Sequence, residues 1–224
     1  MILVTVTIWA VQERATVPRG RHAPPLEVRQ DRQRERLFAA AATVFARGGY
    51  ADASAEAIAR EAGMSKATFY EHFANKEECI VALFDAATGL LLHNMRAAVA
   101  QHADADPATR VRTTLEAFLG TLARFPDESQ TLLVEIVGAG PRAMERRDRA
   151  LEAVAQYIEE LNREDAARGR SPRFASPHDA YAITGAVVEL ASRQIRTGVP
   201  GDIRELEPIV ERLILGLLAA GERP

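Results

Sequence analysis

The sequence predicts an all-α protein of about nine helices, and three observations support this fold class. Apolar residues recur every three or four positions in long runs, which is the period of amphipathic helices. Glycine and proline separate these runs, and β-branched residues seldom alternate with polar ones, so no strand pattern is evident beyond the first few residues. Apolar residues make up 47% of the 224 residues, which is enough for a sizeable core.

Capping residues, glycine and proline set the predicted helix boundaries. Gly48-Gly49 ends the first helix, and Ser54 and Ser65 are good N-caps for the second and third. Asn75 and Glu78 have the spacing of a capping box at the start of the fourth. Later helices begin at proline or stop at glycine. The predicted helices cover, in chain order, residues of about 31–47, 55–62, 66–73, 75–100, 107–125, 128–137, 141–168, 178–197 and 202–220.

The chain divides into three predicted regions that differ in charge. Residues 1–30 form a basic arm, which is either a solvated, disordered tail or a segment that grips phosphates or the minor groove. Residues 31–76 form a three-helix domain, and residues 77–224 form a larger helical domain. Residues 1–76 carry 11 Lys/Arg and 8 Asp/Glu, whereas the remainder carries 17 and 23. A basic amino-terminal part on an acidic body suits a nucleic-acid partner.

Several function classes are excluded by what the sequence lacks. Its single cysteine, Cys79, permits no intrachain disulfide and suits a reducing cytoplasm, where we expect the protein. The apolar segment Met1–Val11 is too short to span a bilayer, so we expect no membrane partner. The five histidines form no HExxH pattern, and Glu159-Glu160 and Glu164-Asp165 look like a solvated helix face. We therefore expect no enzyme, no metal and no cofactor.

The segment Ser54–Phe73 has the pattern of a helix-turn-helix. Two short helices flank a turn at Gly63, whose backbone can adopt a φ that other residues resist. Small residues lie where the helices must cross closely, and the small core between the helices is formed by Ile58, Met64 and Phe69. In this motif the second helix enters the major groove of DNA.

The same region resembles the TetR family of transcription regulators nearly residue by residue. The resemblance covers about 45 residues, together with the total length and the helix count, and beyond residue 80 it is architectural only. The matching positions are Gly49-Tyr50, Ile58-Ala59, Ala62-Gly63-Met64-Ser65, Thr68-Phe69-Tyr70, His72-Phe73 and Asn75-Lys76-Glu77-Glu78.

The resemblance implies which side chains meet DNA. Ser54 and Lys76 would hold phosphates. The third helix would present Lys66, Ala67, Thr68, Tyr70 and His72 to the groove. From the residues alone, Ser65 and the unpaired N–H groups of that helix form an anion site, and Lys66 can reach a phosphate or a guanine edge.

Other interpretations of these residues stay open. Lys76 could be solvated or paired with Glu77 or Glu78, His72 could be a surface residue, and Thr68 could bond to its own helix. Two positions depart from the family pattern: Ala53 replaces the usual Thr, and Ala55 replaces a larger apolar residue. Glu71 is acidic in a helix that must approach phosphates, and we expect it to point away from them rather than to accept from a cytosine amino group.

The carboxy-terminal domain is expected to bind a ligand and to pair two chains. Small residues between Ala182 and Ser192 and the apolar stripe Leu206–Leu218 would let the last two helices form a four-helix bundle with a second copy, as the resemblance implies. Glu189 would bind a polar group of the ligand or pair with Arg193. Candidate ligand contacts, by residue type, are His93, Phe118, Leu122, Phe125, Leu133, Ile136, Met144, Tyr157, Tyr181 and Glu189.

The expected function is sequence-specific regulation of transcription. We expect a homodimer that binds a pseudo-palindromic operator in double-stranded DNA as a repressor, and that a small hydrophobic or amphipathic effector releases. The fourth helix would tilt on effector binding, because an effector acts only through unequal affinity for two conformations. The alternative is a helical small-molecule-binding or adaptor protein with only weak, non-specific DNA binding.

Overall fold

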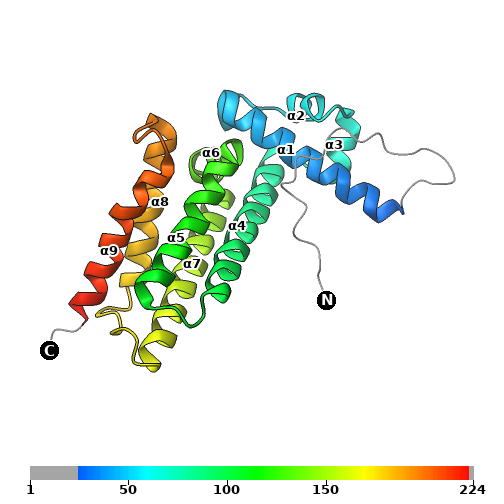
Figure 1. Ribbon diagram of the computed structural model, residues 1–224. Coiled ribbons are helices and arrows are strands. Elements are labelled where there is room, and N and C mark those ends of the chain that lie inside the picture. The colour runs from blue at the N-terminus through cyan, green and yellow to red at the C-terminus, as the bar shows by residue number, and fades with distance from the viewer. Residues whose placement is uncertain (1–24, 222–224) are drawn as a thin grey trace.

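The computed structural model describes residues 25–221, and these form nine α-helices and two short 3-10 helices, without a strand (Figure 1). The predicted all-α fold is therefore confirmed. The elements are α1 (Leu26–Asp52), α2 (Ala55–Glu61), α3 (Lys66–His72), α4 (Lys76–Gln101), α5 (Pro107–Arg124), α6 (Pro126–Leu133), η1 (Glu135–Gly138), α7 (Pro141–Ala167), α8 (Asp179–Thr197), η2 (Ile203–Leu206) and α9 (Glu207–Ala220).

Three predicted boundaries differ from the structure. Helix α1 begins at Leu26, so the last residues of the predicted arm are helical, while residues 1–24 of that arm lie outside the described residues. The predicted end at Gly48-Gly49 corresponds to a kink, because Gly49 has φ 78° and interrupts the helical conformation before a final turn. The predicted ninth helix is preceded by η2, whose capping box of Asp202 and Glu205 closes a separate turn.

Helices α1, α2 and α3 form a small unit, called the head (residues 26–75). Its core is built from fully buried aromatic and aliphatic side chains, with Phe45 and Phe69 at 0% exposure. Phe69 and Phe73 lie 5.5 Å apart between ring centroids, and the Arg34 guanidinium lies 5.0 Å from the Phe73 ring. This packing joins α3 rigidly to α1.

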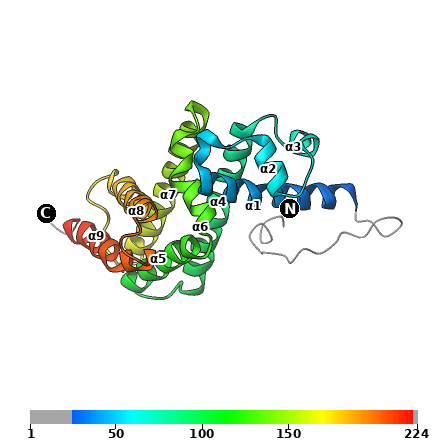
Figure 2. The same ribbon diagram turned by 90° about the horizontal axis from the view of Figure 1, so that it is seen from above.

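The remaining helices form the body (residues 76–221). Helix α4 leaves the head and runs the length of the body against α5, α6 and α7, while α8 and α9 lie on the side of the body opposite the head in both views (Figures 1 and 2). Among the described helices, α4 alone is long and apolar enough to cross a membrane by length and composition. Its ten buried residues explain that hydropathy by packing.

Candidate DNA-binding interface and ligand cavity

The turn between α2 and α3 has the geometry that a helix-turn-helix requires. Gly63 adopts φ +64°, a left-handed conformation that L side chains rarely adopt. The Arg36 guanidinium of α1 donates to the Ala62 carbonyl at 2.6 Å, which satisfies the end of α2. Ile58 and Phe69 are fully buried beneath the turn. The crossing of α2 and α3 is thus fixed by the head core.

Helix α3 presents three exposed residues on its outer face. Lys66 and Ala67 are exposed, and Tyr70 is 49% exposed although it is a large aromatic residue. Lys66 forms an ion pair with Glu56 at 3.6 Å, and both side chains are largely solvated. Such a surface pair is worth little, so the ammonium can exchange Glu56 for a phosphate at small cost.

The three predicted hydroxyl contacts all serve as helix caps or cap partners. Ser54 Oγ accepts from the Ala57 N–H at the start of α2, and Ser65 Oγ accepts from the Thr68 N–H at the start of α3. The hydroxyls of Ser65 and Thr68 lie 3.0 Å apart. Ser54 and Ser65 are exposed and Thr68 is half-buried. These hydroxyls therefore cap the starts of α2 and α3, and they can still form further hydrogen bonds with solvent or DNA.

His72 is half-buried and lies on the side of α3 that faces α1. Its Nε2 is 3.3 Å from Gln33 Oε1. Burial and the neighbouring Arg34 lower the pKa of His72, so the neutral ring is favoured. Glu71 is exposed, and together with His72 it lines a groove between α3 and α1.

Lys76 holds the end of α1 in this structure, and its contact with a phosphate remains a prediction. Its ammonium donates to the carbonyls of Tyr50, Ala51 and Ala53 at 2.9, 2.9 and 3.0 Å. The same ammonium lies 4.6 Å from the centre of the Tyr50 ring. Because an ammonium has three protons, this set uses them all and satisfies the carboxy-terminal carbonyls of α1.

The body contains an apolar cavity of about 140 Å³ between α4, α5, α6, α7, α8 and α9. Its wall is made mainly of aliphatic side chains from all six helices. Four charged or amide groups also border it: Arg110, Arg147, Asn162 and Asp165. A cavity of this size suits a ring or a slender chain.

The candidate ligand contacts lie in several different places, and two of the first eight line the cavity. Phe118 and Leu133 line the cavity. Leu122 and Phe125 border a smaller space of about 20 Å³, and Ile136 is fully buried core. His93 and Tyr181 are exposed, and Met144 is half-buried away from the cavity.

The two remaining candidates have other partners. The Tyr157 ring is buried, with the Arg96 guanidinium 5.3 Å from its centre. Glu189 is exposed and pairs with Arg196 at 3.0 Å rather than with Arg193. Neither borders the cavity.

Sequence reasoning missed the polar group of this cavity. We expected Asp165 on a solvated face, but it is 6% exposed and accepts hydrogen bonds from Arg110 and Arg170. Arg110 itself is 4% exposed. The available signal was helical spacing, because Arg110 precedes Phe118 by eight residues and so lies near the inward face of α5.

Cys79 has the predicted role of a small hydrophobic residue. It is 0% exposed at the start of α4. Burial raises the pKa of the Cys79 thiol to about 12, so the thiol stays protonated and unreactive.

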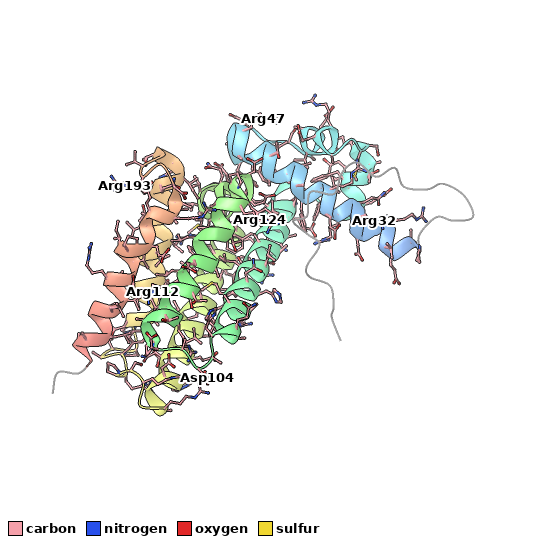
Figure 3. All side chains as sticks on the ribbon, viewed as in Figure 1. Arg32, Arg47, Asp104, Arg112, Arg124 and Arg193 are labelled. Carbon is pink, nitrogen blue, oxygen red and sulfur yellow. The ribbon has the colours of Figure 1, made fainter. Side chains whose placement is uncertain are left out.

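Head and body are joined by hydrogen bonds as well as by α4. Thr43 of α1 donates to Asp127 of α6 at 2.8 Å. The Tyr50 N–H donates to Glu135 at 2.7 Å, and Gln130 orients the same carboxylate at 2.9 Å. Helix α6 also contributes to the cavity wall, so one element touches both the cavity and the head. The side chains at this junction and along the body are drawn in Figure 3.

These features define a class: a helix-turn-helix protein with a cavity-bearing helical body. Residues 37–83 match the model of the family described as bacterial regulatory proteins, tetR family. Residues 37–83 therefore form a helix-turn-helix of the TetR family type, the DNA-binding part of a transcriptional regulator.

Similar proteins agree with this assignment. The transcriptional activator FasR of Mycolicibacterium smegmatis is 35% identical over 89 residues, which cover 40% of this chain and 40% of FasR. The fatty acid degradation regulator FadR of Bacillus halodurans has the same fold, with a TM-score of 0.74 at 22% identity over 82% of this chain and 95% of that one. FadR of Bacillus subtilis, solved with stearoyl-CoA, has a TM-score of 0.72 at 18% identity over 81% and 97%.

Proposed function

We propose that this chain binds a pseudo-palindromic operator as a homodimer, represses transcription, and is released by a small apolar or amphipathic effector. The outer face of α3 carries this proposal. It lies at the end of the molecule away from the body, and its exposed Lys66, Ala67 and Tyr70 have the chemistry to contact phosphates and base edges (Figure 1). Lys76 is left out of the proposed contact set because its ammonium is already bound.

Pairing through α8 and α9 is supported by their unburied apolar side chains. On α9 the buried residues Val210, Ile214 and Leu218 form one face, whereas Ile209 and Leu215 are exposed. Tyr181 of α8 is also exposed. A second copy placed on this side would leave both heads outside the interface (Figure 2). Two recognition helices could then straddle one duplex.

Release by an effector is supported by the two routes from the cavity to the head. Helix α4 lines the cavity with Phe84 and Met95 and begins at Lys76 next to α1. Helix α6 lines it with Leu133 and contacts α1 through Asp127. A ligand that favours one arrangement of these helices shifts the two heads relative to each other. FadR of Bacillus subtilis, which shares the fold, was solved with stearoyl-CoA.

The alternative is a ligand-binding protein without DNA specificity, and one titration separates the two. The DNA upstream of the chain's own gene and a scrambled duplex of equal composition are titrated by fluorescence anisotropy at several salt concentrations. We expect the upstream DNA to bind at least about 1,000-fold more tightly, as specific operators do. Equal affinities for the two duplexes would overturn the proposal.

A matched pair of variants tests whether the outer face of α3 binds the operator. Tyr70→Ala should weaken operator binding, whereas Val137→Ala changes an exposed apolar residue of η1, outside α3 and the proposed pairing surface, and should leave operator binding unchanged. A reporter gene placed behind the operator gives the sign of regulation. Expression should rise when the regulator is deleted, whereas a fall would indicate activation, the role named for FasR.

A further inference from the structure

A buried cluster of unbalanced charge borders one end of the body cavity. Asp165 Oδ1 accepts from Arg110 Nη1 and from Arg170 Nη2, so two guanidinium groups share one carboxylate oxygen. Arg110 and Asp165 are both buried, and both line the cavity. The three groups together carry one net positive charge.

The Arg110 side chain also has an unused donor. Its Nε is buried and has no hydrogen-bond partner among the described residues. The neighbouring polar groups of the wall are already paired: Asn162 bonds to Pro172 and Phe174, and the hydroxyl of Thr184 donates to Ala180. A buried donor on a cation that is only partly neutralised costs free energy, so this position favours an anionic acceptor.

The lining of the cavity extends from this cluster along α4 and reaches α6. Its wall on α4 runs from Phe84 to Met95, a span of about 16 Å at the rise of an α-helix. Arg110 lies in the first turn of α5, beside the end of the body marked by Asp104 in Figure 3, whereas Leu133 of α6 lies toward the head. A volume of about 140 Å³ has room for a slender chain.

We propose that the cavity binds an unbranched, medium-chain monocarboxylic acid in its ionised form. The carboxylate accepts from Arg110, and the alkyl chain runs along α4 toward Leu133. This inference rests on the proposed function only in taking the cavity as the effector site. A thioester of the same chain has no carboxylate to pair with Arg110 and carries a large polar head group in its place.

Arg147 is the other cation that borders the cavity, and it is the weaker candidate for the head group. Its side chain is 25% exposed, and it lies 4.0 Å from Asp148. Water and its neighbour therefore already solvate it, whereas Arg110 is enclosed. The two assignments make opposite predictions for single variants.

Isothermal titration of the full-length protein with octanoate, octanamide, octanoyl-CoA and phenylacetate tests the proposal. Octanoate should bind about tenfold or more tightly than octanamide, because a hydrogen bond between charged groups is lost in the amide. It should also bind more tightly than octanoyl-CoA and phenylacetate. Equal or tighter binding of the amide or of the thioester would contradict a carboxylate site. Tighter binding of phenylacetate would contradict a preference for an unbranched alkyl chain.

Variants locate the head group. Arg110→Gln should weaken octanoate binding about tenfold or more and leave octanamide binding nearly unchanged. Arg112→Gln removes the same charge from an exposed position two residues along α5 and should change neither. A loss caused by Arg147→Gln and not by Arg110→Gln would overturn the assignment. If Arg110→Gln does not fold, the ligand comparison on the unaltered protein still decides.

The same samples separate this inference from the proposed function. Operator binding that persists while octanoate fails to bind would sink the carboxylate site alone. Octanoate binding without any effect on a specific DNA complex would sink the proposed release and leave the site standing.

Discussion

In the head, Phe45 and Phe69 are fully buried, and the hydroxyls of Ser54 and Ser65 each cap a helix. In the body, six helices surround a cavity, and a buried arginine on its wall keeps an unused donor. The head is packed so that α3 has one orientation. The body is packed around a cavity that a small ligand can fill. The division suits a regulator, since a reading surface must be rigid and a sensor must respond.

The largest effect should come from emptying the head core. Phe69→Ala removes a fully buried ring, and we expect a loss of about 3–5 kcal/mol in the free energy of unfolding, measured by urea denaturation. The neighbouring Tyr70→Ala is the control, because that ring is 49% exposed. It should unfold like the parent yet bind operator DNA more weakly. Comparable destabilisation by both changes would contradict a rigid head with an exposed reading face.

The role of Lys76 gives the next largest effect. Lys76→Met removes three hydrogen bonds to α1 carbonyls and should cost about 1–3 kcal/mol of stability. Lys66→Met removes only a solvated ion pair and should change stability by less than about 0.5 kcal/mol.

DNA titrations across a salt series complete that comparison. Loss of a phosphate contact lowers the slope of log affinity against log salt by about one. We expect that decrease for Lys66→Met. The reverse pattern, with the decrease seen only for Lys76→Met, would restore Lys76 as a phosphate contact.

A smaller effect is expected at the junction of head and body. Thr43→Val removes the hydroxyl that donates to Asp127 and should lower the free energy of unfolding by about 1 kcal/mol. Because this bond joins α1 to a helix of the cavity wall, the effector should also change operator affinity less. Asp127→Asn and the double variant complete a double-mutant cycle, and their effects on the free energy of unfolding should be non-additive. Strict additivity would mean that the two side chains do not interact.

The smallest effect concerns Cys79, which should stay inert in the native protein. Burial raises the pKa of its thiol from 9.0 to about 12, so a thiol reagent at pH 8 should react only after denaturant is added. The sign of the pH effect follows. The unfolded chain loses this proton first, so stability falls as pH rises above 9. Cys79→Ala should lessen that fall, and rapid labelling of the native thiol would contradict its burial.

The features predicted correctly from the sequence are those set by near neighbours in the chain. Ser54 and Ser65 cap the helices that follow them, and Gly63 adopts the left-handed turn. The contacts of Lys76 and Asp165 were not predicted because their partners are distant: the carbonyls bound by Lys76 lie 23 to 26 residues away, and Arg110 lies 55 residues from Asp165. A charge pattern along one helix does not show which other helix will cover it.

The residues that line the cavity were hard to predict for a related reason. Residue type alone favoured Tyr157 and Glu189, but tertiary packing directs the first to Arg96 and leaves the second in solvent. The position of a cavity depends on how six helices meet, which no single helix pattern contains.

Selection of bound DNA from a random pool tests the central claim most directly. If two copies present α3 from rigid heads, the selected sequences should share an inverted repeat whose half-sites are separated by about 10–10.5 base pairs or a multiple of that distance. The repeat should disappear when the selection is repeated with Tyr70→Ala. A pool that stays random with the unaltered protein, or a single unrepeated motif, would contradict the account.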